Sequence, residues 1–221
     1  MTLVDGDVKL SHRIAGALIY GRGVNDADYF VKPVINGVRE YCPYYKRWSS
    51  MFQRCYSENY QKRAYTYKGC EVCKEWWSFM AFRSWMMKQD WRGEKELDKD
   101  FIGDGTLYSP NTCVFIDMWL NKAMHERSKV EGQMPMGVVR AGARFRSQFR
   151  FEGKWLYKIH NNIQDARAEY LLQKAKYIRS RYAEMCQDVS LACERKLSKL
   201  YTDAGLEFSP MKTTGGLDGK K

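Results

Sequence analysis

The sequence lacks any run of about 18 consecutive apolar residues, the length that a membrane-spanning helix requires. Its opening stretch, MTLVDGDVKLSHRIAGALIYG, lacks the basic segment followed by an apolar core that is typical of a secretory signal peptide. We therefore expect neither a membrane-spanning segment nor a signal peptide, and we expect no membrane partner.

Histidine is scarce, and the cysteines form no metal-binding pattern beyond one pair. Cys70 and Cys73 make a single C-x-x-C, whereas a structural zinc site usually requires a second such pair or a spaced pair of histidines. Cys42 and Cys55 are the candidates for further zinc ligands, but we favour buried thiols and expect no zinc. The cysteine total of 7 is odd, which argues against a disulfide framework and for a reducing, cytoplasmic compartment.

Acidic residues are too few to balance the basic ones. The chain has 37 Lys and Arg against 26 Asp and Glu, a formal net charge of +11. A cationic surface attracts polyanions, so nucleic acid is the first candidate partner and an anionic membrane surface the second. The hydrophobic content of 44% is enough for one large domain or two small ones. The aromatic content of 14% is not that of a disordered chain.

The first half predicts an arm followed by two helices. Residues 1–43 show little periodicity, and we expect them to pack as an N-terminal arm. Residues 44–92 carry aromatic and apolar side chains at helical spacing, which predicts a helix–loop–helix with these side chains in its core. They are Trp48, Met51, Phe52 and Cys55 in the first helix, and Trp76, Phe79, Met80, Arg83 and Met87 in the second.

The pattern changes over residues 97–124, where a strand, a loop, a second strand and a helix are expected in that order. The run TCVFI is rich in β-forming residues, and Asp117 suits the N-cap of the helix that follows it. Residues 125–135 are polar and contain Gly and Pro, so we expect a linker there.

The second half predicts a three-stranded sheet covered by a helix. In residues 144–151, Arg and Gln alternate with Phe and Ser, so one face of the strand is cationic and the other aromatic. A helix from Asn162 carries an apolar stripe that suits the aromatic face. The stripe consists of Ile163, Ala166, Tyr170, Leu171, Tyr177 and Ile178, interrupted by Lys174. We expect a further helix within residues 186–208 and a disordered tail over 209–221. The fold class is α+β.

Two segments resemble known families. Residues 44–124 resemble phage-encoded HNH endonucleases in the runs YYKRWSSMFQRCYSENYQKRAYTYKGCEVCKEWWSFMAFRSWM and LDKDFIGDGTLYSPNTCVFIDMWLN. Residues 136–175 resemble an AP2-type DNA-binding domain in their Gly-Val start, in RFRSQFR and KWLYKI, and in the alanine-bearing helix that follows. The order is typical of phage homing endonucleases, which act in the cytoplasm of a bacterial host. The resemblance implies an HNH-like nuclease domain over 44–128 and an AP2-like domain over 136–185.

The resemblance also implies a ββα-metal centre. In such a centre a His activates water, and an Asp and a helix Asn hold one divalent metal, Mg²⁺ or Mn²⁺, that stabilises the departing oxygen. Asp98 and Asn121 stand at the two metal-ligand positions. Lys99 stands where the His belongs, and Thr112 stands where a second Asn would orient that His.

This departure leaves two functions open. A metal-dependent endonuclease would use Asp98, Lys99 and Asn121, with Lys99 on the phosphate and water activated by the metal alone or by Asp100 or Asp104. The alternative is a catalytically inactive DNA-binding protein of the same architecture. Asn111 in a shifted register and His125 beyond the helix are weaker candidates for the missing groups. A protein that contacts only other proteins is the third hypothesis.

Both leading functions require double-stranded DNA as the partner. The candidate DNA-binding residues are the basic ones of the expected sheet, since strands can enter the major groove. They are Arg140, Arg144, Arg146, Arg150 and Lys154.

Overall fold

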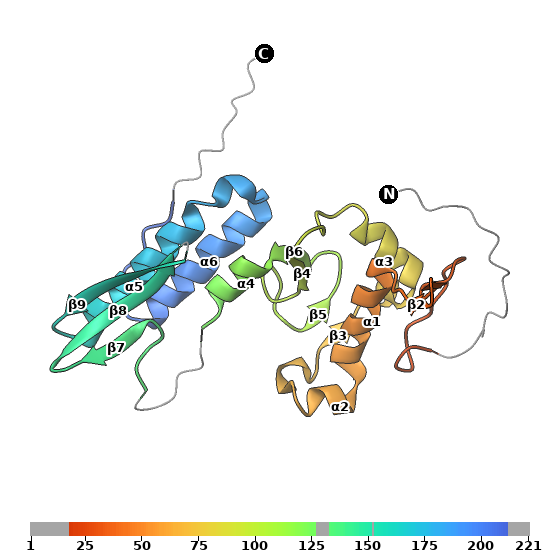
Figure 1. The fold of residues 1–221 in the computed structure, drawn as a ribbon, viewed down its shortest axis with the longest axis horizontal. Helices are drawn as coiled ribbons and strands as arrows, with labels where there is room; N and C mark the ends of the chain where they lie inside the picture. Colours follow the sequence, from red (N-terminus) through yellow and green to blue (C-terminus); the bar gives the residue numbers. More distant parts are fainter. Residues whose placement is uncertain (1–17, 127–132, 152, 212–221) are drawn as a thin grey trace, which may run out of the picture. The chain divides into compact units, whose positions relative to one another are not determined.

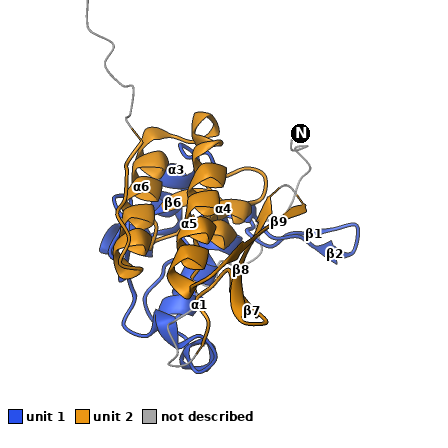
Figure 2. Ribbon diagram, turned by 90° about the vertical axis from the view of Figure 1, so that its left-hand side faces the viewer, with its two compact units in different colours: residues 1–90, 103–113 blue, residues 91–102, 114–221 orange. Residues whose placement is uncertain are grey.

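The structure, a computed structural model, describes residues 18–126, 133–151 and 153–211. It has the mixed α+β fold that the sequence predicts, with helices and several small sheets (Figure 1). The chain divides into two compact units, which Figure 2 shows in different colours. The first unit comprises Met1–Asp90 and Gly103–Cys113, and the second comprises Trp91–Ile102 and Val114–Lys221.

Unit 1 is built around an aromatic core between two helices. Helix α1 (Pro43–Tyr56) begins with Pro, whose fixed φ suits the first helical position, and helix α3 (Phe79–Met86) begins after its N-cap Ser78. Between the two helices, the ring centroids of Trp48 and Phe79 lie 5.5 Å apart with the planes tilted by 57°, and the indole N–H of Trp48 donates to the carbonyl of Trp76 at 2.7 Å. The predicted helix–loop–helix is therefore confirmed.

The inward stripe of α3 differs in part from the predicted one. Phe79, Phe82 and Met86 are buried, whereas Met87 is exposed and follows the last residue of the helix. The reason is that Trp76 lies in a separate 3₁₀ turn, η2 (Lys74–Trp77), so the helical periodicity starts three residues later than the sequence pattern suggests.

The remaining elements of unit 1 are short. They are β1 (Val34–Ile35), β2 (Val38–Arg39), α2 (Glu58–Gln61), η1 (Tyr65–Tyr67), β3 (Glu71–Val72) and β5 (Leu107–Tyr108). Strands β1 and β2 form an antiparallel hairpin, and β3 pairs in parallel with β5.

Unit 2 contains the other two sheets. Strand β4 (Lys95–Asp98) pairs antiparallel with β6 (Val114–Asp117), and helix α4 (Met118–Met124) follows directly. A three-stranded antiparallel sheet has the order β7 (Val138–Ala141), β8 (Arg144–Phe151) and β9 (Lys154–His160). Helix α5 (Ile163–Arg179), the 3₁₀ turn η3 (Tyr182–Glu184) and helix α6 (Gln187–Asp203) complete the unit. Helix α5 begins where the sequence predicts, and Asn162 caps it by accepting the backbone N–H of Asp165 at 2.8 Å.

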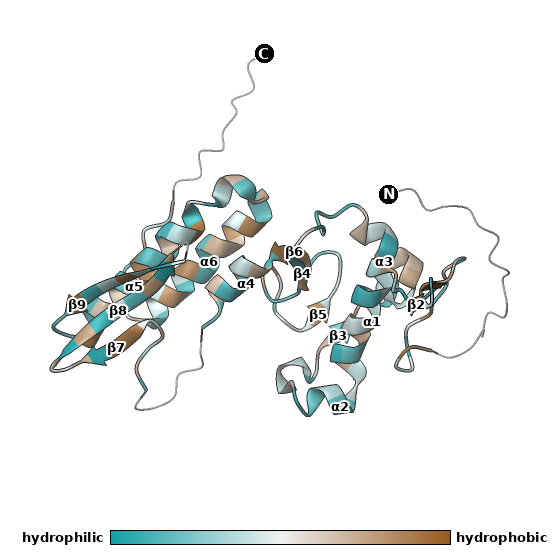
Figure 3. Ribbon diagram, in the orientation of Figure 1, coloured by the Kyte–Doolittle hydropathy of each residue, from teal (hydrophilic) through white to brown (hydrophobic). Residues whose placement is uncertain are grey.

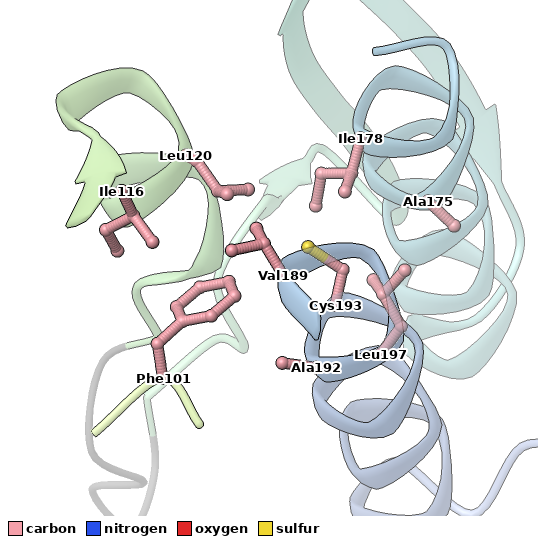
Figure 4. Close-up of a cluster of buried hydrophobic side chains, with 9 residues drawn as sticks. All are labelled: Phe101, Ile116, Leu120, Ala175, Ile178, Val189, Ala192, Cys193 and Leu197. Carbon is pink, nitrogen blue, oxygen red and sulfur yellow. The ribbon is translucent and has the colours of Figure 1, made fainter. Parts of the chain in front are cut away.

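One buried cluster explains why the boundaries between units differ from the expected domains. We expected residues 44–128 to form one domain, but β4, β6 and α4 belong to unit 2. Ile116 of β6 and Leu120 of α4 pack in one core with residues of α5 and α6 (Figure 4). The full cluster is Phe101, Ile116, Leu120, Ala175, Ile178, Val189, Ala192, Cys193 and Leu197. The ββα segment therefore shares its core with the C-terminal helices rather than with α1 and α3.

Part of the predicted disordered tail is anchored. Residues 212–221 lie outside the described residues, but the carbonyl of Ser209 accepts from Arg179 at 2.8 Å, and the N–H of Met211 donates to Glu194 at 3.1 Å. Glu194 also accepts two guanidinium N–H groups of Arg179 at 2.8 Å and the hydroxyl of Tyr182 at 2.7 Å. Burial alone would raise the pKa of Glu194, but these hydrogen bonds outweigh burial and lower it.

Replacing Glu194 by Gln is expected to lower the free energy of unfolding at pH 7 by about 1–3 kcal/mol, because charge-assisted hydrogen bonds are lost. A carboxylate with a lowered pKa stabilises the fold above its ordinary pKa of 4.5 and loses that effect as pH falls through the lowered value. The difference between wild type and Glu194→Gln in urea unfolding should therefore shrink toward pH 3. Glu207→Gln, a change at an exposed carboxylate, is the control and should match wild type at both pH values.

Candidate nucleic-acid interface

The alternation of side chains along β8 gives the three-stranded sheet two different faces. Phe149 and Phe151 point toward α5, and their rings lie 5.8 Å and 5.2 Å from the ring of Tyr177. Ser147, on the same face, is buried. The prediction that the helix covers the aromatic face is confirmed, and the opposite face of the sheet is left to the basic residues.

The outer face, opposite α5, combines arginines with aromatic side chains. Arg144, Arg146 and Arg150 of β8 share this face with Gln148. Strand β9 adds three side chains directly across from them: Trp155 pairs with Arg150, Tyr157 with Gln148 and Ile159 with Arg146. Val139 of β7 pairs with Arg146 on the other side. None of the described strand residues on this face is acidic.

Cation–π contacts fix the positions of two arginines. The guanidinium of Arg146 lies 4.9 Å from the ring centroid of Tyr157, and that of Arg150 lies 6.0 Å from that of Trp155. The two rings are themselves stacked, with centroids 6.0 Å apart and planes at 10°. Trp155 and Tyr157 nevertheless remain 51% and 55% exposed. The outer face therefore presents positive charge and accessible ring surface together.

The sequence interpretation missed the contribution of β9. The signal was present, because Trp155, Tyr157 and Ile159 alternate with Lys154, Leu156 and Lys158 in the run KWLYKIH. Aromatic residues that alternate along a strand usually face a core, so the sequence alone suggests that Trp155 and Tyr157 are buried. The position of α5 shows that they lie on the exposed face of the sheet.

Two of the five predicted basic residues lie on the other face. Arg140 pairs with Phe145, and its guanidinium lies 5.3 Å from that ring. Lys154 pairs with Phe151 at the end of the hairpin. Side chains that are directly opposite in an antiparallel pair share a face, so Arg140 and Lys154 belong to the face that α5 covers. The expectation that all five residues act together is corrected to Arg144, Arg146 and Arg150.

The candidate nuclease centre lies in the ββα segment formed by β4, β6 and α4. The predicted order of strand, loop, strand and helix is confirmed, although the side chain of Asp117 makes no capping hydrogen bond. Asp98 is the last residue of β4, and its Oδ1 accepts the N–H of Asp100 at 2.7 Å. Burial, together with the negative charge of Asp100, raises the pKa of Asp98.

Asn121 contacts a carboxylate that the sequence interpretation did not select. Its amide nitrogen donates to Oε2 of Glu96 at 3.0 Å, and within the described ranges no hydrogen bond joins it to Asp98. Glu96 and Asp98 are two residues apart on β4 and share one face. The residues that the structure describes include no group of three or more His, Cys, Asp and Glu side chains able to hold a metal. Two carboxylates and one amide oxygen suit Mg²⁺, which proteins often bind through one or two carboxylates with substrate phosphates completing the shell.

Lys99 does not have the surroundings of a general base. Its side chain is buried, and its ammonium lies 2.6 Å from the carboxylate of Asp100. Asp100 is thus committed to an ion pair. Asp104 accepts the N–H and hydroxyl of Thr106 at 2.9 Å and 2.8 Å, and these hydrogen bonds lower its pKa, which makes it a weaker base.

The other candidate positions are also accounted for. The hydroxyl of Thr112 donates to the carbonyl of Leu107 at 2.6 Å and so closes a turn of unit 1. Asn111 is exposed in that turn, and His125 is exposed directly after α4.

Of the cysteines considered for zinc, Cys55 and Cys70 are buried, while Cys42 and Cys73 are partly buried.

Across residues 18–126, 133–151 and 153–211, no helix combines the length and the hydrophobicity needed to cross a membrane. Comparison of the chain with protein-family models, with curated proteins and with solved structures finds no match in any of the three.

Proposed function

We propose that this chain binds duplex DNA through the outer face of the β7–β8–β9 sheet. The observation that carries the proposal is a face with three arginines, two exposed aromatic rings and no acidic side chain among the strand residues that the structure describes, on the side of the sheet opposite α5. Arginines neutralise phosphates and read guanine edges, and strands are narrow enough to enter the major groove. The formal net charge of +11 supports association with a polyanion.

The chemistry of the face divides its residues into two roles. Arg144 and Arg150 are exposed, near the two ends of β8, and suit phosphates. Arg146 lies centrally, where its Nη2 donates to Gln148 at 3.4 Å and Tyr157 supports its guanidinium. A side chain held in place in this way loses little conformational freedom on binding, so Arg146 and Gln148 suit base edges.

The triple variant Arg144→Ala, Arg146→Ala and Arg150→Ala is expected to weaken binding to a mixed-sequence duplex by about 100-fold or more at 100 mM salt. Each phosphate contact contributes about 0.9 to the slope of log K against log salt, so loss of the two phosphate contacts of Arg144 and Arg150 should lower the slope by about 2. Fluorescence anisotropy across a salt series measures both quantities.

A second triple variant that loses the same number of positive charges elsewhere distinguishes the effect of the outer face on DNA binding from the effect of net charge. Lys176, Arg195 and Lys199 are exposed on α5 and α6, away from the outer face. Their replacement by Ala should leave the slope within about 0.5 of wild type. Equal losses in the two triple variants would mean that net charge, and not this face, drives binding.

A second candidate function is a metal-dependent DNA endonuclease, and the ββα arrangement with Glu96, Asp98 and Asn121 favours it. A divalent ion, when bound, would supply stabilisation of the negative charge on the scissile phosphate and leaving oxygen. Asp98, Glu96 and the amide oxygen of Asn121 would hold the ion, and the amide nitrogen of Asn121 would orient Glu96 through its hydrogen bond. The ion pair of the buried Lys99 with the exposed Asp100 would keep Asp100 in place beside Asp98.

The endonuclease hypothesis predicts nicking of supercoiled plasmid by wild type with Mg²⁺ or Mn²⁺, because each chain has one centre. Asp98→Ala and Glu96→Gln are expected to lower the nicking rate by about 100-fold, the scale typical of a lost catalytic contribution. Glu207→Gln should cut like wild type, and EDTA should stop the reaction. Tight binding of plasmid by wild type without any metal-dependent nicking would leave the inactive DNA-binding protein as the function.

A further inference from the structure

Unit 1 contains a surface that the proposed function leaves unexplained, the β1–β2 hairpin. Two backbone hydrogen bonds extend its ladder, from Glu40 N–H to Pro33 and from Cys42 N–H to Val31, both at 2.9 Å. Val31 is buried, and Cys42 directly precedes α1. We call residues 31–42 the hairpin arm: its base is anchored in the unit, and its tip is the turn at Asn36 and Gly37.

The tip of the hairpin arm is apolar and exposed. Val34 and Val38 are 64% and 63% exposed, and Ile35 is 43% exposed. Figure 3 colours the ribbon of the hairpin, beside the label β2, by hydropathy. Asn36 and Gly37 both have positive φ, the conformation of the tight two-residue turn that matches the twist of a hairpin. Three β-branched side chains at one exposed tip contribute nothing to a core, so the tip is suited to contact with a partner.

Positive charge lies along one face of the hairpin arm, with Arg39 beside the tip and Lys32 nearer the base. Arg39 pairs with Val34 across the hairpin, and the ammonium of Lys32 lies 5.0 Å from the ring centroid of Tyr41. Alternation places Lys32, Val34, Arg39 and Tyr41 on this face, and Pro33, Ile35, Val38 and Glu40 on the other. The single carboxylate of the arm, Glu40, lies opposite Pro33, one rung below Arg39 and on the other face from the two cations.

We propose that the hairpin arm is a second DNA contact, in which the apolar tip wedges against a base step in the minor groove while Lys32 and Arg39 bind the flanking phosphates. The proposal rests on the proposed DNA binding and adds a different contact to it. Valine and isoleucine offer no hydrogen bonds to base edges, but apolar side chains can insert at a base step, unstack it and bend the duplex.

Charge and length favour DNA over two other occupants. The arm carries two cations along one face, Arg39 beside the tip and Lys32 nearer the base, which complements phosphate, whereas a second copy of the arm would bring those cations together. Strands of two residues each are also too short to hold two copies together by pairing. A membrane surface would attract the same cations, and the experiment therefore includes vesicles.

The test uses the full chain and a mixed-sequence duplex of about 40 base pairs with dyes at both ends, so that anisotropy reports affinity and energy transfer reports bending. The tip variant Val34→Ser, Ile35→Ser and Val38→Ser is expected to bind about 10-fold more weakly, to keep the wild-type salt slope and to lose the bend. Lys32→Gln with Arg39→Gln should instead lower the slope by about 2. Leu172→Ser with Met87→Ser, which removes exposed apolar side chains elsewhere, should match wild type.

The outcomes separate the arm from the sheet. Wild-type affinity and wild-type bending in the tip variant would overturn the proposal, while loss of binding in the Arg144, Arg146 and Arg150 variant would still support the sheet. Absence of any duplex binding by wild type would overturn the proposed function and the arm with it. Unchanged DNA binding by the tip variant, with lost sedimentation on vesicles of anionic lipid, would assign the arm to membranes instead.

Discussion

Replacing Gly137 by Ala is expected to lower the free energy of unfolding by about 3 kcal/mol or more. A Cβ at this position would lie 1.9 Å from Cδ2 of Tyr170, and the residue has a φ of +80°, which favours glycine. The backbone cannot move away easily, because the Gly137 carbonyl accepts the N–H of Gln148 at 2.8 Å. Tyr170 in turn packs at 5.8 Å from Phe149, so the strain falls on the contact between the sheet and α5.

Gly142→Ala is the matched control for this prediction. Gly142 has a φ of +63°, but a Cβ there would meet nothing within 4 Å. Gly142→Ala should lower the free energy of unfolding by only about 1–2 kcal/mol, because the alanine adopts a left-handed backbone conformation without a steric clash. Urea unfolding followed by circular dichroism measures both variants. Equal costs would show that the clash with Tyr170 is relieved by rearrangement, and the packing described for α5 would then be incorrect.

Replacing Glu126 by Ala is expected to lower the free energy of unfolding at pH 7 by about 3–5 kcal/mol. The ammonium of Lys174 is fully buried and lies 2.5 Å from Glu126, which also accepts from Arg167 at 3.0 Å. Removing the shared carboxylate leaves two cations close together, one of them without water, and such uncompensated charges cost about this much.

The pH dependence of the free energy of unfolding of Glu126→Ala tests whether the buried Lys174 causes the loss of stability. Burial lowers the pKa of Lys174, while its hydrogen bond to Glu126 opposes the shift. A lysine whose pKa is lowered by folding binds protons more readily when unfolded, so stability rises as pH rises toward the ordinary value of 10.5. Without Glu126 this rise should be steeper, and Lys174→Met in the same background should restore most of the loss. A flat profile without rescue by Met would exclude the buried lysine as the cause.

The sequence predicts this fold well where the signal is local. The period-2 pattern of RFRSQFR and the capping Asn162 determine β8 and the start of α5 from neighbouring residues alone. Lys174 shows the limit: in the sequence it interrupts an apolar stripe, and its partner Glu126 lies 48 residues away, before the sheet. Lysine is almost never fully buried unless it is paired with an opposite charge. The periodicity of residues within α5 cannot indicate that Glu126 provides this charge.

The candidate sites show the same limit. Alternation along β8 predicts the cationic face, but Arg140 and Lys154 depend on cross-strand register, which the turns and the core fix together. At the ββα segment the spacing of Asp98 and Asn121 matches a family pattern, whereas the partner of Asn121 is Glu96. The packing of α4 against β4 decides which carboxylate Asn121 contacts. This packing depends on the buried cluster that α4 shares with α6.

Because the chain passes between the two units more than once, it limits how the protein can be cut into folded fragments and how its gene can be recombined. The polypeptide leaves unit 1 after Asp90, returns for Gly103–Cys113 and leaves again before Val114. No single peptide-bond cleavage can therefore release either unit as an intact fragment. A fragment starting at Val114 lacks β4 and the buried Phe101, and a fragment ending at Asp90 lacks β5, the partner of β3. Gene fusions, truncations and recombination events that respect both units must carry residues 91–113 as a shared segment.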